Sequence, residues 1–432
     1  MKVSRYNFIH TKNDITVFYN SRTGALATVD SEFMKVIKAI EDGSFIEDEY
    51  SPVLISQMKY AGAIIDDEIN ELKEIEFISN SQKYESSALY LTIAPTLNCN
   101  CRCKYCYEKR EKNELSLELQ EAILKFIQHY TKIKTLEVVW YGGEPLLTKS
   151  IVWSISEKIM EHCLNNDISY SASMISNLTL MTEDDCVLFK KFSINKFQAT
   201  LDGSRDTHNK IRIEPNSTDS YGKILKNINL LLSNNINVDI RVNLDRNNIT
   251  DLDSLFEELR TSLLNSPHLH IYPGRITNYS KVCNSIESSC LSDNEWDCSE
   301  LQFFEKCIKY GFKEQIKPFI INKTRFLSCG AEQKNFVIVD NKGYLYKCML
   351  HVGNVDKAYG KVTDDVTDTS ESIKWIMESP FGFDKCKTCD KLPICMGGCK
   401  EIRFKTKEPA CPHKSESYFL EKIDFYMLNY LE

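Results

Sequence analysis

Glycine, proline and long apolar runs are scarce in this 432-residue sequence, which has only 16 glycines and 11 prolines. Disordered and collagenous chains are rich in these two residues, so both classes are excluded. No run approaches the roughly 18 apolar residues that a membrane-crossing helix needs, and residues 1–20 contain no signal-peptide core. We therefore expect a globular protein of the cytoplasm with no membrane partner.

Positive charge is also in short supply. The 53 Lys and Arg residues face 61 Asp and Glu residues, which gives a formal net charge of −8, and no basic run stands out. An acidic surface repels phosphate groups, so nucleic acid and anionic membranes are excluded as partners. At this length we expect two or three domains, each able to bury its own core.

Cysteine, by contrast, is abundant, with 17 residues. Thiols stay reduced in the cytoplasm, so these residues do not indicate a disulfide framework. An excess of reduced thiols indicates metal or redox chemistry, and the spacing of the cysteines shows which kind.

The N-terminal part, residues 1–82, is predicted to be a small α+β domain. The alternating runs ITVFY and ALATVD flank the turn NSRTG, and helical patterns follow at 31–41 and 53–61. The mixed polar stretch 79–86 is predicted to be a linker.

Residues 83–275 are predicted to form an α/β domain. About six apolar β-rich runs alternate with helical segments, which predicts parallel strands with crossover helices in a partial (β/α)6 TIM-type barrel. The chemistry of such a barrel lies at the carboxyl ends of its strands. A bridging helical segment, 276–328, contains a predicted helix at 295–317. In residues 329–432 we expect little secondary structure and metal sites in place of a hydrophobic core.

Three cysteines, Cys99, Cys103 and Cys106, follow the first predicted strand as CxxxCxxC, with Tyr105 before the third. Three thiolates leave one iron of a four-iron cubane open, and that iron can chelate amino and carboxylate groups. Zinc usually takes four protein ligands and is the alternative.

The segment WYGGEP follows the second strand. Gly142 and Gly143 allow close approach of the backbone to a ligand, Glu144 offers a carboxylate to an amine, and Pro145 stiffens the turn. The alternative is an ordinary turn between a strand and a helix.

Together, CxxxCxxC and GGEP resemble the radical SAM superfamily. SNLTL at 176–180 and ATLDGSRDTHNKIR at 199–212 are similar to two further motifs of that family, although Leu178, Thr200 and Asn209 replace its usual residues. The resemblance implies a 4Fe-4S cluster on the three cysteines and S-adenosylmethionine (SAM) as cofactor. It also implies a low-potential electron donor such as flavodoxin or ferredoxin. The residues that it implies as SAM contacts are Tyr105, Gly142, Gly143, Glu144, Pro145, Asn177, Thr200 and Arg212. We interpret Asp202 and His208 as turn-capping residues with local hydrogen bonds.

The later cysteines resemble the SPASM extension of radical SAM enzymes, with a Gx4C element at Gly343 and CxxCx5CxxxC in the last hundred residues. The resemblance implies two auxiliary 4Fe-4S clusters, and a zinc site is the alternative. The distal cluster is expected on Cys386, Cys389, Cys395 and Cys411, and the proximal one on Cys329, Cys348 and Cys399. The proximal set is one ligand short, so either one iron stays open or another residue, such as Cys283, Cys290, Cys298 or Cys307, completes it.

The SPASM resemblance favours a peptide substrate. The N-terminal segment FYNSRTGALATVDSEFMKVIKAI resembles winged-helix-like leader-recognition domains of maturases that act on ribosomally made peptides. Such domains bind a leader peptide as an added edge strand. The alternative is a cap that only packs against the barrel.

We therefore predict a radical SAM oxidoreductase that modifies a precursor peptide, with a thioether or other crosslink as the expected product. Peptide epimerisation and sulfatase maturation are alternatives. Sulfatase maturases carry an Asp after the cysteine of the Gx4C element, whereas Met349 follows Cys348 here. An alternative of another class is a non-catalytic iron–sulfur protein that binds a peptide.

Overall fold

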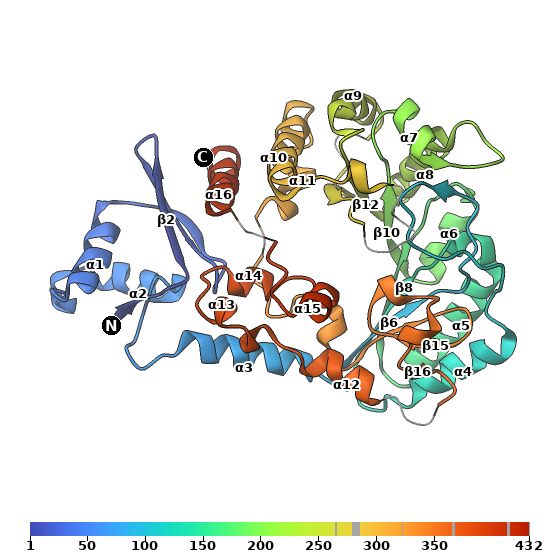
Figure 1. Cartoon of the computed structure of the whole chain (residues 1–432), viewed down its shortest axis with the longest axis horizontal. Coiled ribbons are helices and arrows are strands. Elements are labelled where there is room, and N and C mark those ends of the chain that lie inside the picture. Colours follow the sequence, from blue (N-terminus) through green and yellow to red (C-terminus); the bar gives the residue numbers. More distant parts are fainter. Residues whose placement is uncertain (264–265, 279–285, 322, 365–367, 413–414, 432) are drawn as a thin grey trace. The chain divides into compact units, whose positions relative to one another are not determined.

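The computed structural model describes residues 1–263, 266–278, 286–321, 323–364, 368–412 and 415–431 (Figure 1). These residues form two compact units. We call Ser86–Phe319 with Asn335–Ile373 the sheet unit. We call Met1–Glu85 with Ile320–Lys334 and Lys374–Glu432 the terminal unit. The four domains expected from the sequence stay a prediction.

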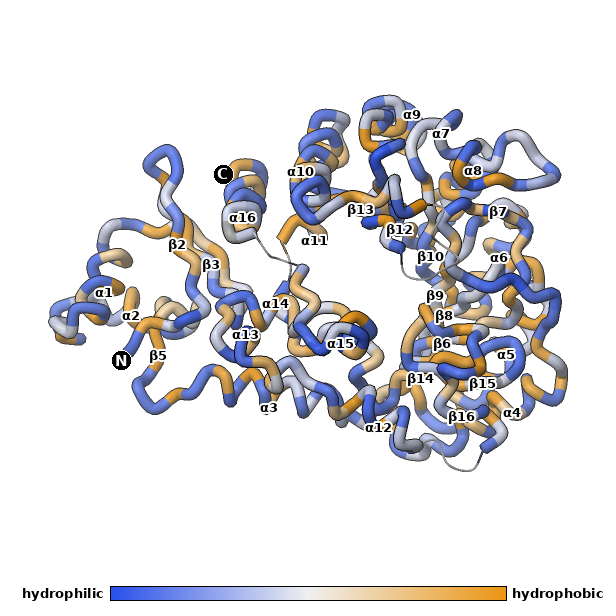
Figure 2. Tube along the Cα trace, in the orientation of Figure 1, coloured by the Kyte–Doolittle hydropathy of each residue, from blue (hydrophilic) through white to orange (hydrophobic). Residues whose placement is uncertain are grey.

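The sheet unit is built on a nine-stranded sheet with the order β13-β12-β10-β9-β8-β6-β14-β15-β16. Its first six strands pair in parallel with their neighbours in chain order, which confirms the predicted α/β class. Alternate positions of these strands are buried, and Figure 2 colours the chain by hydropathy, with apolar residues in the strands of this sheet. The parallel strands are β6 (Ala88–Ile93), β8 (Thr135–Trp140), β9 (Ser169–Ile175), β10 (Ile194–Thr200), β12 (Asn237–Leu244) and β13 (Leu269–Arg275).

Helices connect the parallel strands. The predicted helix at 295–317 is two helices, because Gly311 adopts a φ of 89° that ends the first. Ser292 and Glu295 form a capping box at the start of that first helix. No helix among the described residues is long and apolar enough to cross a membrane. The helices are α4 (Leu117–Gln128), α5 (Lys149–Asn165), α6 (Asp185–Lys191), α7 (Arg205–Ile211), α8 (Ser220–Ser233), α9 (Leu252–Leu263), α10 (Asp293–Lys309) and α11 (Lys313–Ile320).

Part of the cysteine-rich segment extends this sheet. β14 (Phe336–Val339) runs parallel to β6, and β15 (Tyr344–Tyr346) and β16 (Gly360–Lys361) continue the sheet antiparallel. Side chains of β14 and β15 share an apolar core with residues just before the first cysteine motif. The expectation of little secondary structure after residue 329 is therefore wrong.

The terminal unit begins with a small antiparallel sheet in the order β2-β3-β4. Two helices follow close to the predicted ranges, which confirms the α+β pattern of this segment. The elements are β1 (Lys2–Val3), β2 (Asn7–Lys12), β3 (Ile15–Asn20), β4 (Leu26–Val29), α1 (Ser31–Asp42), α2 (Pro52–Ala61) and β5 (Ile64–Ile65), which pairs with β1.

The predicted linker at 79–86 is wrong over most of its length, because helix α3 (Glu71–Lys83) runs through it. Ser79 is fully buried and Lys83 is 2% exposed, so polar residues that are typical of a linker lie in the interior. Ile75 of the same helix packs in an apolar group with residues of the cysteine-rich segment. Tertiary packing therefore outweighs the polar character of the sequence here.

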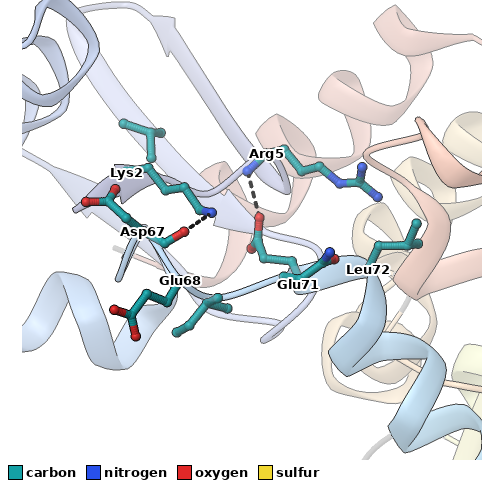
Figure 3. A pocket seen from close by; sticks show the side chains of 9 residues that line it. Lys2, Arg5, Asp67, Glu68, Glu71 and Leu72 are labelled. Carbon is teal, nitrogen blue, oxygen red and sulfur yellow. Dashed lines mark hydrogen bonds between the residues drawn. The ribbon is translucent and has the colours of Figure 1, made fainter.

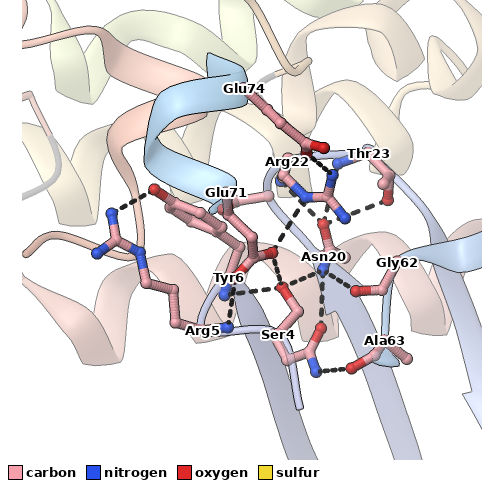
Figure 4. A network of polar contacts seen from close by, with 12 residues as sticks. Ser4, Arg5, Tyr6, Asn20, Arg22, Thr23, Gly62, Ala63, Glu71 and Glu74 are labelled. Atoms are coloured by element: carbon pink, nitrogen blue, oxygen red, sulfur yellow. Dashed lines mark hydrogen bonds and ion pairs between the residues drawn. The ribbon is translucent and has the colours of Figure 1, made fainter. Parts of the chain in front are cut away.

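A network of polar contacts anchors the start of α3 to the small sheet (Figure 4). The Glu71 carboxylate accepts hydrogen bonds from Ser4 Oγ at 2.5 Å and from the Arg5 backbone N–H at 3.2 Å. It also forms an ion pair with Arg22 Nε at 3.1 Å. Figure 3 shows the adjoining pocket, of about 420 Å³, where Lys2 and Arg5 lie beside Asp67 and Glu71. Side chains of both charge signs therefore line this pocket, next to the contacts of Glu71 that fix the start of α3.

The end of the chain packs against its beginning within the terminal unit. Phe419 of α16 lies 4.8 Å from Phe8 of β2 between ring centroids, in an apolar group that includes Ile394 and Met427. The expectation that metal sites replace a hydrophobic core in this region is therefore wrong. The remaining helices are α12 (Ser370–Met377), α13 (Asp384–Lys387), α14 (Leu392–Cys395), α15 (Lys400–Thr406) and α16 (Glu416–Tyr430).

Candidate cluster and cofactor site

The first cysteine motif lies on the loop that follows β6. Cys99, Cys103 and Cys106 are partly exposed, whereas Cys101 between them is buried. Strand β7 (Arg102–Cys103) pairs with β11 (Arg212–Ile213), so Cys103 lies opposite Arg212. The pKa of the Cys99 thiol is lowered, chiefly by its hydrogen bond with Cys101, and burial raises the pKa of Cys106 to about 12. The loop is thus fastened to the segment after β10.

The two glycines of the GGE turn pack directly against the backbone of the cysteine loop. A Cβ atom on Gly143 would lie 2.2 Å from the carbonyl oxygen of Asn98, and one on Gly142 would lie 2.5 Å from that of Thr96. The Gly143 N–H donates to the Thr96 carbonyl at 3.1 Å. Any side chain at either glycine would force the two strand ends apart.

The Glu144 carboxylate is 1% exposed and fastens the ends of β8 and β9 together. It accepts hydrogen bonds from Leu146 N at 2.9 Å, Ser176 Oγ at 2.8 Å and Asn177 N at 2.7 Å. Burial raises the pKa of Glu144, and these hydrogen bonds oppose the shift. Pro145, also buried, begins the short helix after the turn. The predicted contact of Glu144 with the SAM amine stays a prediction.

Asn177 lies against the cysteine loop. Its Nδ2 donates to Asn100 Oδ1 at 2.9 Å and lies 3.8 Å from Cys99 Sγ. The next residue, Leu178, adopts a φ of 59°, in the left-handed region that glycine favours. This geometry explains why glycine is the usual residue of the family motif at this place.

The Tyr105 hydroxyl joins the cysteine loop to the ends of two strands. It donates to Asp202 Oδ2 at 2.5 Å and accepts from Arg212 Nη1 at 2.6 Å and Asn243 Nδ2 at 3.1 Å. Burial raises the pKa of Tyr105, and the Arg212 guanidinium opposes the shift. The interpretation of Asp202 as a local turn-capping residue is therefore wrong, because its hydroxyl partner lies 97 positions away.

Two further residues of the motif at 199–212, His208 and Thr200, have no hydrogen bond to the cysteine loop among the described residues. His208 Nδ1 accepts a hydrogen bond from Asp202 N at 3.1 Å, which agrees with the local role that we expected. Burial lowers the pKa of His208 well below its usual value. Thr200 ends β10 beside Arg241 of β12. Among the described residues, no hydrogen bond joins the Thr200 side chain to the cysteine loop.

The residues present fit an iron–sulfur cluster with an amino-acid ligand. Arg212 Nε is buried without a hydrogen-bond partner, so a guanidinium N–H beside the cysteine loop stays available to an anion such as a carboxylate. Within the described ranges, no three His, Cys, Asp or Glu side chains converge closely enough for a single metal ion. Thiols around a four-iron cubane stand further apart than ligands of one ion, because each binds a different iron.

Four C-terminal thiols form a second group, inside the terminal unit. The pKa of Cys386 is raised to about 12, first by burial and then by the neighbouring charges of Cys395, Cys411 and Cys389. The pKa of Cys395 is raised to about 11 by burial, with Cys389 and Cys411 adding to the shift. These thiols therefore lie close enough to influence one another, and this donor set fits a polynuclear site.

Two glycines shape the loop between Cys395 and Cys399. Gly397 and Gly398 adopt φ angles of 75° and 73°, which side chains rarely tolerate. A Cβ on Gly398 would lie 1.7 Å from the carbonyl oxygen of Ala410, and the Ala410 N–H donates to the Gly397 carbonyl at 2.9 Å. Backbone contact thus brings the segment before Cys411 to this loop.

The predicted proximal set is divided between the units. Cys329 and Cys399 belong to the terminal unit, whereas Cys348 belongs to the sheet unit. Of the candidates for a further ligand, Cys283 lies outside the described residues, and Cys307 is fully buried on α10. Cys163 and Cys186 are buried on α5 and α6 and pack in the interior of the sheet unit.

A cleft of about 410 Å³ lies beside strand β4, an edge of the small sheet. The lining of the cleft is mainly apolar, and its polar residues are Thr28 of the strand, Asp30 and Gln57. The Asn20 N–H donates to the Ala25 carbonyl at 2.9 Å. Because hydrogen-bonded pairs alternate along antiparallel strands, the N–H groups of Leu26 and Thr28 face the outer edge. The apolar residues of the cleft are Phe18, Ala27, Val29, Phe33, Leu54, Met58 and Ala61.

The model of the radical SAM superfamily matches residues 93–259. The chain is 24% identical over 366 residues to the cysteine-type anaerobic sulfatase-maturating enzyme of Clostridium novyi, across 78% of this chain and 93% of that protein. It is 20% identical over 324 residues to the serine-type enzyme of Klebsiella aerogenes, across 70% of this chain and 76% of that protein.

Two solved structures share the fold. Native anSMEcpe with bound AdoMet and Kp18Cys peptide superposes with a TM-score of 0.59 at 17% identity, over 80% of this chain and 97% of that one. Streptococcus suis SuiB bound to precursor peptide SuiA gives a TM-score of 0.55 at 14% identity, over 94% and 97%. Both share an α/β fold with a parallel sheet, a small N-terminal antiparallel sheet and a C-terminal region. The chain is therefore a radical SAM enzyme, with its radical SAM domain at residues 93–259, related to the anaerobic sulfatase-maturating enzymes and to SuiB.

Proposed function

We propose that this enzyme is a maturase of a ribosomally made precursor peptide. Its radical SAM cluster is held by Cys99, Cys103 and Cys106, and its parallel sheet is the partial (β/α)6 barrel expected from the sequence. When bound, the cluster and SAM supply one low-potential electron and a 5′-deoxyadenosyl radical that removes hydrogen from the substrate. Flavodoxin or ferredoxin is the proposed electron donor.

The side chains at the strand ends orient the cofactor in this proposal. The open Arg212 N–H receives the carboxylate of SAM, and Asn177 lies beside the cluster. The glycines of the GGE turn keep its backbone close to the cysteine loop, which would leave peptide groups rather than side chains at this place for a bound cofactor. Glu144 and Tyr105 hold these strand ends in register.

The observation that carries the peptide substrate is edge strand β4 with its apolar cleft. An extended peptide can pair with the outward N–H groups of Leu26 and Thr28, while one of its apolar side chains enters the cleft between Phe33 and Met58. We therefore assign the leader-binding role to residues 1–82, as a winged-helix-like domain.

The cysteines of the last hundred residues support the choice of reaction. We propose two auxiliary 4Fe-4S clusters, of which the distal one has its four thiols together in the terminal unit. Crosslinking, unlike epimerisation, removes electrons from the substrate and needs an acceptor, which auxiliary clusters supply. A thioether or other crosslink is therefore the proposed product.

Sulfatase-type maturation is the second candidate, because the sequence is 24% identical to a sulfatase-maturating enzyme. The residue after Cys348 argues against it. Met349 packs against an apolar group of the sheet unit, where sulfatase maturases carry a carboxylate that resembles a general base. Epimerisation remains the third candidate reaction.

The test is anaerobic reconstitution followed by iron counting and assay of SAM cleavage. We expect roughly twelve irons, as three cubanes require, and loss of about a third of them with all cleavage when Cys99, Cys103 and Cys106 become Ala. Peptides encoded by short reading frames next to the gene, and a Cys-containing sulfatase peptide, are compared as substrates. Bound zinc, or no cleavage of SAM, would overturn the proposal.

A variant pair tests the leader site. Thr28→Pro removes an outward N–H of β4 and should weaken binding of the precursor, whereas Thr28→Ala keeps this N–H and should bind normally. Cleavage of SAM without peptide should be equal in both variants. Equal precursor affinity in both variants would rule out strand addition at β4.

A further inference from the structure

A network of buried charges lies inside the terminal unit, where α3, α12 and α15 meet the short helix η5 (Gly330–Glu332). Arg403 Nη2 donates to Glu332 Oε1 and to Glu378 Oε2, both at 2.8 Å, and its side chain is fully buried. Lys400 Nζ lies 3.4 Å from Glu378 and 3.8 Å from Glu332. Lys83, from the end of α3, is 2% exposed, and we count it as the fifth member because Glu332, Glu378 and Arg403 act on it electrostatically.

The charges of this network do not balance. Three cations, Lys83, Lys400 and Arg403, face two carboxylates, Glu332 and Glu378. Burial lowers the pKa of Lys83, Glu332 and Glu378 act to raise it, and the Arg403 guanidinium acts to lower it. A surplus positive charge in a buried place is costly unless an anion lies nearby. A third carboxylate, Glu76 of α3, also acts on Lys83, but it is partly exposed and forms an ion pair with Lys73 at 3.0 Å, so it does not offset the buried surplus.

The network contacts the segments that carry the thiols. Arg403 Nη1 donates to the carbonyl oxygens of Met396 and Gly398, each at 2.8 Å, in the loop between Cys395 and Cys399. A guanidinium thus holds the backbone of a ligand-bearing loop.

The acidic residue Glu332 of the network contacts the segment that carries Cys329. The Glu332 carboxylate accepts from Ser328 N at 3.2 Å and from Ser328 Oγ at 2.7 Å, next to Cys329. Lys400 acts electrostatically on the Cys329 thiol, and Arg403 on that of Cys386. Cations of the network therefore act on two thiols of the terminal unit, Cys329 and Cys386.

We propose that this network raises the reduction potential of the iron–sulfur clusters bound by the thiols of the terminal unit, with Lys83 as its surplus charge. The proposal rests on the proposed function, in which these thiols hold clusters. A thiolate-bound cluster is anionic and gains one further negative charge when it takes up an electron, so a nearby buried cation favours the reduced form. Lys83 lies outside the cysteine motifs and acts through the network, as a positioning and tuning residue.

The test is a redox titration of the auxiliary clusters, followed by electron paramagnetic resonance. The full chain carries Cys99, Cys103 and Cys106 all changed to Ala, so that the auxiliary signals are seen alone. Lys83→Met keeps the length of the side chain and removes its charge. We expect the ratio of reduced to oxidised cluster at the parent midpoint to fall about tenfold, which is 59 mV for one electron.

Two further variants separate charge from structural damage. Glu378→Gln removes a negative charge and should shift the midpoint in the opposite direction, to a more positive value. Lys35→Met, on the exposed face of α1, should leave the potential unchanged. Shifts of Lys83→Met and Glu378→Gln in the same direction, or no shift in either, would overturn the tuning role.

The iron content distinguishes failure of the proposed clusters from failure of the tuning role alone. If the parent binds no iron at these cysteines, the proposed clusters are wrong and the tuning role with them. If iron is bound and the potentials do not move, only the tuning role is wrong. If Lys83→Met loses its iron, Lys400→Met is titrated in its place with the same expected shift, and an unshifted midpoint there overturns the proposal.

Discussion

Glu144 accepts a hydrogen bond from the backbone N–H of Asn177 at 2.7 Å, and this contact fastens the carboxyl ends of β8 and β9 to each other. The other carboxylate oxygen holds Leu146 N and Ser176 Oγ. A residue expected to meet the cofactor thus also determines where the neighbouring Asn177 side chain lies. That side chain in turn approaches Cys99.

The first prediction concerns this carboxylate. Glu144→Gln replaces one acceptor oxygen by an NH2 group, which faces a donor in either orientation, so a buried N–H or hydroxyl is left without its partner. We expect a loss of about 1–3 kcal/mol in the free energy of unfolding and weaker SAM binding. Chemical denaturation and SAM titration measure both. Glu137→Gln, on the exposed side of β8, is the control, and equal stability of the two variants would contradict the prediction.

The second prediction concerns the Tyr105 hydroxyl, which Asp202 and Arg212 share. Tyr105→Phe and Asp202→Asn should each slow SAM cleavage and alter the paramagnetic spectrum that SAM induces in the cluster. Because the two side chains act as one unit, the double variant should be little worse than either single one. Strictly additive losses would show that the hydroxyl contact has no role.

The third prediction concerns Gly398. A Cβ there meets the Ala410 carbonyl oxygen at 1.7 Å, so Gly398→Ala should push the loop away from the segment before Cys411. We expect loss of about a third of the iron, one cubane of three, with SAM cleavage retained. Gly382→Ala, where nothing lies within 4 Å, is the matched control. Full iron content in Gly398→Ala would mean that this contact is not needed for cluster binding.

The fourth prediction concerns acid stability. Hydrogen bonds from Lys306 first, then from Lys309 and Tyr310, lower the pKa of Asp253, which joins α9 to α10. A lowered carboxyl pKa stabilises the fold above the unfolded value of about 4, and this contribution is lost as the pH falls through the folded value. Since the pair is largely exposed, Asp253→Asn should cost less than about 1 kcal/mol at neutral pH.

The difference between parent and Asp253→Asn should shrink as the pH is lowered below about 4, because the carboxyl group is then protonated in the unfolded chain, and it should vanish once the pH has passed the lowered folded value. Denaturant unfolding at several pH values measures this. Glu137→Gln serves again as the control. A difference that stays constant down to acid pH would show that ion pairing at Asp253 does not stabilise the fold.

Local spacing accounts for what could be predicted. The thiols of Cys99, Cys103 and Cys106 lie on one loop because only a few residues separate them, and the alternation of strands and helices indicated where that loop ends. The glycines of the GGE turn were expected to approach a ligand. The structure shows that they also approach the backbone of the cysteine loop, which a motif alone does not reveal.

Polar composition misled the prediction at α3. Ser79 and Lys83 are typical of a solvated linker, and nothing in the neighbouring residues shows that they are buried. Their environment comes from segments hundreds of positions later in the chain, such as Glu332 and Arg403. The sequence signal of the helix was the helical spacing of Leu72, Ile75 and Ile78, which ends before the polar residues from Ser79 onward.

The sequence by itself determined the expected chemistry of this protein, because thiols at short spacing and glycines at tight turns depend on local geometry. Only the tertiary structure decided which distant groups surround them. Tyr105 and Asp202 meet across 97 positions because the order of the parallel strands brings their ends to one edge. Lys83 joins Glu332 and Arg403 because the two ends of the chain bury apolar surface in one shared core, and that packing is a property of the whole fold.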